Sequence, residues 1–129
     1  MALVVLDASV VIGHLSDRHR HHEGASAALA DREGDDLRLP ASAYAESLVR
    51  AERLGEGEEA RGLIAELAIA VDAIGVATAE AAARLRAAHG SLRLPDALVI
   101  AHADVLEADE LLTTDVRWLD YSRRVSVVR

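Results

Sequence analysis

The sequence predicts an α/β fold in which a mainly parallel β-sheet is covered by helices on both faces. Short apolar runs, typical of buried strands, alternate along the chain with longer stretches of helical periodicity. Helices of this kind connect parallel strands and bury both faces of their sheet. With 129 residues, the chain is most simply one domain over residues 1–129, and it has no cysteine for a disulfide framework.

Apolar patterning predicts the first four elements. Leu3–Leu6 is a run of four apolar residues and is expected to form a buried strand. A short apolar helix should begin at Ser9 or Val10, and an alanine-rich helix should include Ala25–Ala30. Leu37–Leu39, which directly precedes a proline, is expected to be a brief second strand.

The middle of the chain predicts two helices and a third strand. Ser42–Leu54 has one apolar side, with Ser42 as a candidate N-cap and Gly55 placed as a C-terminal stop. A further helix is expected at about Glu58–Leu67, and Val71–Ile74 is a candidate strand.

The last elements complete the alternation. Thr78 should cap a helix that reaches Ala88, and Pro95 should open another, since a proline in the first helical turn loses no hydrogen bond. Leu111–Thr113 is predicted to be a fourth strand and Val125–Val128 an edge strand.

The basic side chains are all arginine, and the formal net charge is -8. The lack of lysine excludes P-loop phosphate binding and Schiff-base catalysis. Phosphoacceptor receiver domains and haloacid-dehalogenase-type phosphatases resemble one another in needing a lysine near the reactive aspartate. The second class also needs a D-x-D pair, and Ser9 occupies its second position here. The negative charge disfavours nucleic acid at long range unless local cations offset it.

The chain shows no basic leader and no stretch near the roughly 18 uncharged residues that a membrane-spanning helix requires. We therefore expect a cytoplasmic protein that does not enter a membrane.

Four acids occupy similar places relative to the predicted elements. Asp7 and Asp115 follow the first and fourth strands, Glu46 lies in the first turns of the helix after the second strand, and Asp96 lies in the first turn of the helix that Pro95 opens. In open parallel sheets, ligands bind beyond the carboxyl ends of the strands. All four carboxylates are therefore expected to face one pocket.

Each acid also has an ordinary structural explanation. Asp7 fits an Asx turn or a cap, Asp96 suits the dipole of its helix, and Glu46 can pair with an arginine four residues later. Asp115 fits a turn. The combination favours a metal, because two carboxylates 4 Å apart repel by about 4 kcal/mol at an effective dielectric constant of 20.

Oxygen ligands select hard cations, so the predicted site should prefer Mg²⁺ or Mn²⁺ to zinc. Such ions activate water and stabilise the leaving oxygen of a phosphodiester. The residues therefore favour hydrolytic phosphoryl chemistry, and a bound metal would also reduce the repulsion between this acidic chain and a phosphate.

Four segments together resemble the PIN-domain ribonucleases, in particular the VapC toxins of VapBC toxin–antitoxin pairs. They are VVLDASVVI, AYAESLVRA, LRLPDALVIAHA and LLTTDVRW, in this order. The resemblance implies an α/β/α sandwich with a five-stranded parallel sheet, Mg²⁺-dependent cleavage of RNA, homodimerisation and inhibition by a cognate VapB-type antitoxin. It assigns the catalytic and metal-binding roles to Asp7, Glu46, Asp96 and Asp115.

The resemblance also places residues around the acids. Ser9 and Thr113 match hydroxyl positions and would hold a metal-bound water or orient a carboxylate. Where many relatives carry a further acid, this chain has Arg117, which either contacts RNA or neutralises a neighbouring aspartate. Arg50 and Arg53, one and two turns beyond the helical glutamate, are candidates for guiding RNA.

Two histidine features are expected to lie outside the site. The run HRHHE at residues 19–23 lacks the four ligands that a structural zinc site usually needs, and the resemblance places it away from the acids. His102 lies six residues after Asp96, so it points to another side of the helix and is expected to be a surface or packing residue. The main alternative function is a catalytically silent PIN-fold module that binds RNA or a partner.

Overall fold

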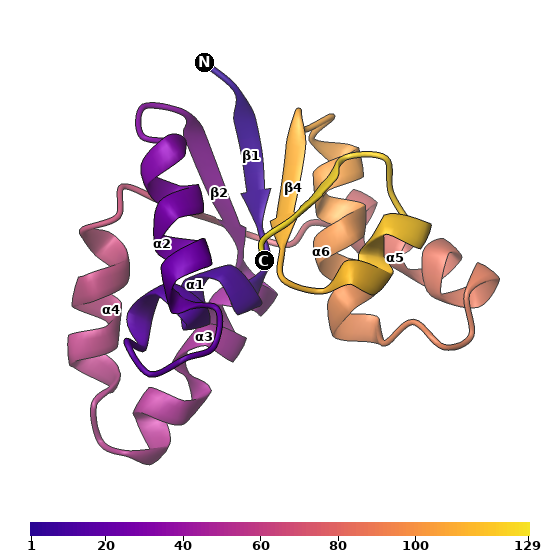
Figure 1. Ribbon diagram of the computed structural model, residues 1–129. Helices are drawn as coiled ribbons and strands as arrows, with labels where there is room; N and C mark the ends of the chain where they lie inside the picture. The colour runs from indigo at the N-terminus through magenta and orange to yellow at the C-terminus, as the bar shows by residue number, and fades with distance from the viewer.

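A computed structural model describes residues 1–129, and it contains a five-stranded, all-parallel central sheet (Figure 1). The strand order is β3-β2-β1-β4-β5, and each neighbouring pair is parallel. The strands are β1 (Leu3–Leu6), β2 (Asp36–Pro40), β3 (Ala70–Asp72), β4 (Glu110–Thr113) and β5 (Val125–Val127). The predicted α/β/α sandwich is confirmed.

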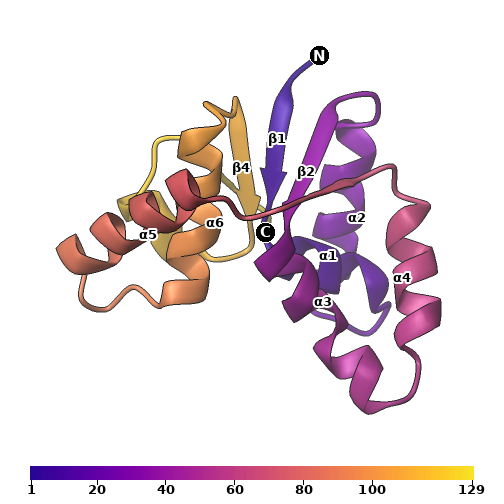
Figure 2. The same ribbon diagram turned by 180° about the vertical axis from the view of Figure 1, so that it is seen from behind.

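Six α-helices and one short 3₁₀ helix accompany the sheet (Figure 1). They are α1 (Ala8–Leu15), α2 (His22–Asp31), α3 (Ala41–Arg53), α4 (Gly57–Ala65), α5 (Val76–Ala88), α6 (Leu94–Val105) and the 3₁₀ helix η1 (Val116–Asp120). The segment that holds β3 runs from α4 to α5 on the side turned to the viewer in Figure 2. No helix is long and apolar enough to cross a membrane.

The sheet is buried on both faces because its strands are apolar at successive positions. In β1, Val4 and Leu6 point to one face and Val5 to the other, and all three are buried. In β2, Leu37 and Leu39 are buried on one face, whereas Arg38 points to the other and stays partly exposed. The face of β2 that carries Arg38 therefore holds a charged side chain that needs an ion-pair partner.

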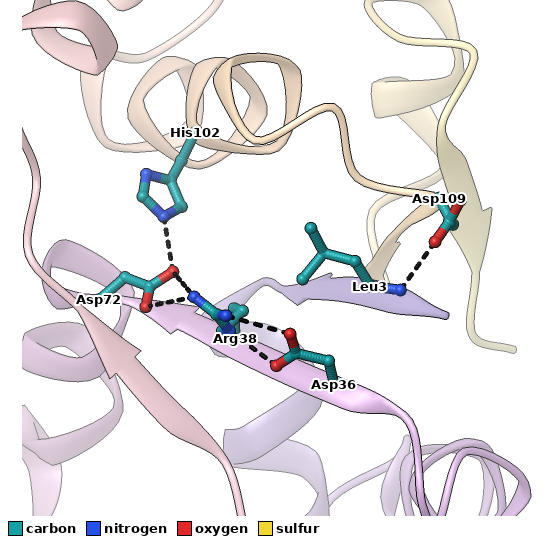
Figure 3. A network of polar contacts seen from close by, with 6 residues as sticks. All are labelled: Leu3, Asp36, Arg38, Asp72, His102 and Asp109. Atoms are coloured by element: carbon teal, nitrogen blue, oxygen red, sulfur yellow. Dashed lines mark hydrogen bonds and ion pairs between the residues drawn. The ribbon is translucent and has the colours of Figure 1, made fainter. Parts of the chain in front are cut away.

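The charged face of β2 is tied to α6 by a chain of polar contacts (Figure 3). His102 Nε2 lies 3.0 Å from Asp72 Oδ2, and Asp72 Oδ1 accepts from Arg38 Nη1 at 3.1 Å. Arg38 also holds Asp36 through two hydrogen bonds, of 2.7 and 3.0 Å. His102 is thus a packing residue rather than a surface residue, and it joins α6 to β3 and β2.

Two predicted helix caps are wrong. Helix α3 begins one residue before Ser42, because Pro40 ends β2 in an extended conformation and serves as the N-cap. The Ser42 hydroxyl is instead buried without a hydrogen-bond partner. Helix α5 begins after Gly75, so Thr78 lies inside it, where its Oγ1 is 3.3 Å from His102 Nδ1. The predicted stop at Gly55 is confirmed by its φ of 73°.

Candidate metal centre

Asp7 lies at the carboxyl end of β1 and is buried, with 8% of its surface exposed. Its Oδ2 accepts hydrogen bonds from Ser9 Oγ at 2.7 Å and from Thr113 Oγ1 at 2.8 Å. No protein donor contacts its Oδ1. Burial raises the pKa of Asp7 to about 6, even though the two hydrogen bonds act in the opposite direction.

The two hydroxyl groups hold Asp7 in one orientation. Each donates to the carboxylate and accepts from the backbone that follows β4, at 3.1 Å from Thr114 N to Ser9 Oγ and from Asp115 N to Thr113 Oγ1. The ends of β1 and β4 are adjacent, since Asp7 N donates to Leu112 O at 2.9 Å. Ser9 and Thr113 therefore orient a carboxylate, which is one of the two roles expected for them.

The charges of the other acids affect one another's pKa values and that of Asp7. Burial raises the pKa of Glu46 and of Asp96, and in Glu46 the charge of Asp96 adds to this effect. Asp96 also raises the pKa of Asp7 and is itself affected by Asp115. Asp96 is thus the common neighbour of the other three, which come from β1, α3 and the end of β4. The structure brings the four predicted acids to one edge of the sheet.

Asp115 differs from the other three acids because it forms an ion pair with an arginine. Arg117 donates from Nε to Oδ1 at 3.0 Å and from Nη2 to Oδ2 at 2.7 Å. These hydrogen bonds lower the pKa of Asp115. Asp115 is the N-cap of η1, and 77% of the Arg117 side chain is exposed, so the ion pair is weak enough to open. Of its two expected roles, Arg117 is placed to neutralise Asp115.

The arrangement supplies suitable donors without forming a closed metal cage. No three histidine, aspartate or glutamate side chains lie close enough together to hold a metal ion. Asp115, in addition, is engaged by Arg117. The donor chemistry itself fits Mg²⁺ or Mn²⁺, since it is carboxylate oxygen, and Asp7 presents a free one. A metal shared by the four acids stays a prediction.

Arginines near the acids were only partly anticipated. Arg93, directly before α6, lowers the pKa of Asp96 and of Glu46 and was not singled out from the sequence, although it stands three residues before Asp96. Arg50 lines a pocket together with Glu46, whereas Arg53 does not. Arg93 differs from other surface arginines only because α3 packs against α6, which brings it near Glu46.

The histidine run at residues 19–23 forms no metal cluster but lies nearer the acids than expected. His22 Nδ1 is 3.0 Å from Gly13 O, and His14 Nδ1 is 2.8 Å from Ser26 Oγ, so these side chains join α1 to α2. Arg20 and His21 border a hollow that also includes Asp115. His19 lines a pocket with Glu46, so the expectation that the whole segment lies away from the acids is wrong for His19, Arg20 and His21.

Comparison with known proteins identifies the family and the fold of the chain. The model of the PIN domain family matches residues 4–124. A search of curated protein sequences finds no match. Solved structures with a similar fold include a toxin–antitoxin complex from Klebsiella pneumoniae, with a TM-score of 0.80, 21% identity and coverage of 98% of each chain.

Two further solved structures share the fold. VapBC2 from Rickettsia felis, bound to a DNA fragment from its promoter, has a TM-score of 0.80 at 11% identity, over 98% of this chain and 99% of the other. VapC20 from Mycobacterium tuberculosis, described as a sarcin-ricin loop cleaving toxin, has a TM-score of 0.71 at 13% identity, over 84% of this chain and 86% of the other.

Proposed function

The chain belongs to the PIN-domain family, and from this premise we propose that it is a Mg²⁺-dependent endoribonuclease, the toxin of a type II toxin–antitoxin pair. The observation that carries the proposal is that Asp96 of α6 influences, or is influenced by, the charges of three other acids, which come from the ends of β1 and β4 and from α3. Three of them, Asp7, Glu46 and Asp96, have raised pKa values, and carboxylates of this kind at the carboxyl edge of a parallel sheet are typical of a catalytic site.

Each acid has a distinct place in the proposed mechanism. Asp7, Glu46, Asp96 and Asp115 would hold Mg²⁺, with Mn²⁺ as an alternative ion. When bound, the metal supplies activation of water and stabilisation of the leaving oxygen of the phosphodiester. Asp7 would be a well-oriented ligand, because two hydroxyls fix one of its oxygens and leave the other free.

Nearby arginines would offset part of the negative charge of the four acids. Arg117 would release Asp115 to the metal, and its guanidinium would then be available to the RNA backbone. Arg93 offsets part of the negative charge of Glu46 and Asp96. Arg50, which lines a pocket with Glu46, is a second candidate for contact with RNA, and Arg53 lies further along the same helix face.

RNA is proposed as the substrate on the fold and the site, with recognition through phosphates rather than bases. The chain has one tryptophan and two tyrosines, and Trp118 is buried in the core. Few side chains can therefore stack on bases. The VapC20 toxin with a similar fold is described as cleaving the sarcin-ricin loop, so a structured RNA is a suitable first substrate.

The decisive test separates a nuclease from a silent RNA-binding module. Purified protein, freed of any bound partner, is incubated with structured RNAs and either Mg²⁺ or EDTA. We expect defined fragments with Mg²⁺ and none with EDTA. Binding of RNA without fragments at any Mg²⁺ or Mn²⁺ concentration would favour the silent module.

An antitoxin partner is proposed at a pocket of about 350 Å³ between α1, α3 and α4. Its apolar lining includes Ile12, Leu15, Leu54 and Leu63, and its acidic lining includes Asp17, Glu46, Glu56 and Glu59. An apolar helix carrying an arginine would satisfy both kinds of group. We expect the protein, when expressed with its neighbouring genes, to purify as a homodimer bound to a small, partly basic protein. Purification of the chain alone would contradict this assignment.

A further inference from the structure

A second hollow adjoins the candidate metal centre on the side of Asp115. It has a volume of about 550 Å³ and lies at the end of the sheet where β4 and β5 finish. The lining residues are Arg20, His21, Thr114, Asp115, Val116, Val127, Val128 and Arg129. The hollow therefore joins the loop before α2 and the C-terminal segment to an acid of the candidate metal centre.

The walls of this hollow are packed tightly. Val128 N donates to Thr113 O at 2.8 Å, which continues the pairing of β5 with β4. Gly24, in the first turn of α2, packs directly on the end of the chain. A Cβ at this position would collide with the backbone carbonyl of Arg129 and lie 3.1 Å from Val128 Cγ1. In both views the C-terminus lies near the carboxyl ends of β1 and β4 (Figures 1 and 2).

The charge of the hollow differs from that of the whole protein. Arg20 and Arg129 are exposed, and neither guanidinium has an ion-pair or hydrogen-bond partner within the chain. The one acidic side chain of the lining, Asp115, is held by Arg117 through two side-chain hydrogen bonds. The side chains of the lining therefore include two guanidinium groups and one neutralised carboxylate, in a chain with a formal net charge of -8.

We propose that this hollow, lined by Arg20, His21 and Arg129, binds phosphates of the RNA strand next to the phosphate that enters the candidate metal centre. This assignment rests on the proposed function, because the hollow would bind the part of the RNA strand next to the phosphate that is cleaved. Contacts to phosphate fix the register of a nucleic acid without reading its bases, which fits a chain poor in exposed aromatics. Thr114, between the hollow and Ser9, places the two regions in direct continuity.

The test compares two arginines of the same loop. Arg20→Ala removes a guanidinium from the hollow, and Arg18→Ala removes an exposed one that does not line it. We expect Arg20→Ala to raise the KM for RNA about 5- to 10-fold and to leave kcat within about 2-fold, since a single phosphate contact is lost at a distance from the reacting bond. Arg18→Ala should leave both constants unchanged.

Salt dependence supplies a readout that misfolding would not produce. Binding of a labelled single-stranded RNA is measured in an Asp7→Asn background between about 50 and 200 mM salt. The slope of log K against log salt should become shallower by about 0.7 in Arg20→Ala, the value for one phosphate contact on a single strand. Equal slopes in Arg20→Ala and the parent, or an equal loss in Arg18→Ala, would overturn the proposal.

The outcomes also separate this proposal from the proposed function. If the wild-type protein cleaves RNA and Arg20→Ala matches Arg18→Ala, the hollow is not an RNA subsite and the nuclease stands. If the wild-type protein does not cleave RNA but Arg20→Ala alone weakens RNA binding, the hollow is an RNA subsite and the nuclease assignment fails.

Discussion

Asp7→Asn and Asp96→Asn are each expected to reduce Mg²⁺-dependent RNA cleavage by about 100-fold or more, because losing one group that stabilises transition-state charge already costs about that much. Asp7 offers the free, rigidly held oxygen of the site, and Asp96 is the acid that interacts with the other three. Initial rates on a structured RNA, measured at fixed Mg²⁺, check this expectation.

The matched control for these substitutions is Asp31→Asn, at the exposed end of α2. It makes the same chemical change away from the four acids and should retain wild-type rates. Circular dichroism spectra of all three variants should match the wild type. Full Mg²⁺-dependent activity in either site variant would reject the assignment of that acid.

The same Asp7→Asn substitution is expected to stabilise the protein in the absence of metal. Its pKa rises from 3.8 to about 6 on folding, so the charged form is disfavoured in the native state. At about 1.4 kcal/mol for each pKa unit, this corresponds to about 3 kcal/mol of destabilisation at neutral pH. An asparagine keeps an oxygen for the Ser9 and Thr113 hydroxyls and removes the charge. We expect the free energy of unfolding to rise by about 1 to 3 kcal/mol.

The pH window for this gain follows from the direction of the pKa change. A raised native-state pKa means that the native protein binds the proton more tightly than the unfolded chain does. The contribution of Asp7 to stability is thus fully present below pH 3.8 and is lost as the pH rises through about 6. The advantage of Asp7→Asn should accordingly be small at pH 4 and complete at pH 8, in urea unfolding with EDTA present.

Metal should reduce this difference in stability between Asp7→Asn and the wild type. Mg²⁺ that binds only the native wild-type protein raises its melting temperature by mass action, and the variant that lacks a ligand should gain less. Asp31→Asn should respond to pH and to Mg²⁺ as the wild type does. A wild-type melting temperature that does not change at millimolar Mg²⁺ would contradict a pocket of several carboxylates.

The order of the elements could be predicted from the sequence because local patterns determine it. The apolar run at Leu3–Leu6 and the stop at Gly55 need no knowledge of distant residues, and both agree with the structure. The proximity of Asp7 and Asp115 was predictable for a related reason, because they follow the adjacent parallel strands β1 and β4, whose carboxyl ends share an edge. Asp96 lies in α6, which follows α5 and not a strand, so its place near them depends on helix packing.

Features that depend on long-range contacts could not be predicted in this way. Thr78 resembles a helix cap locally, but its hydroxyl faces His102, which lies 24 residues later in α6. The η1 helix, which positions Arg117 on Asp115, was missed because no apolar periodicity marks so short an element. Arg20 lies within a histidine run in the sequence, and only the packing of the C-terminal segment on α2 brings it near Asp115.

The role of Asp7 links stability to the proposed function. Most buried acids in proteins are paired with a cation, whereas Asp7 is held by neutral hydroxyls beside two further acids that raise its pKa. The fold thus keeps a carboxylate in a position that costs stability when no cation is present. Such a cost is expected where a site is arranged for a ligand rather than for the fold.

The most direct test of the account is the position of a bound cation. Crystals of the protein soaked in MnCl₂ are examined by anomalous diffraction at a wavelength where manganese scatters strongly. The account predicts an anomalous peak in contact with the free oxygen of Asp7 and with the carboxylate of Asp96, with Glu46 and Asp115 facing the same ion directly or through water. A strong peak elsewhere on the chain, with none among these four acids, would contradict it.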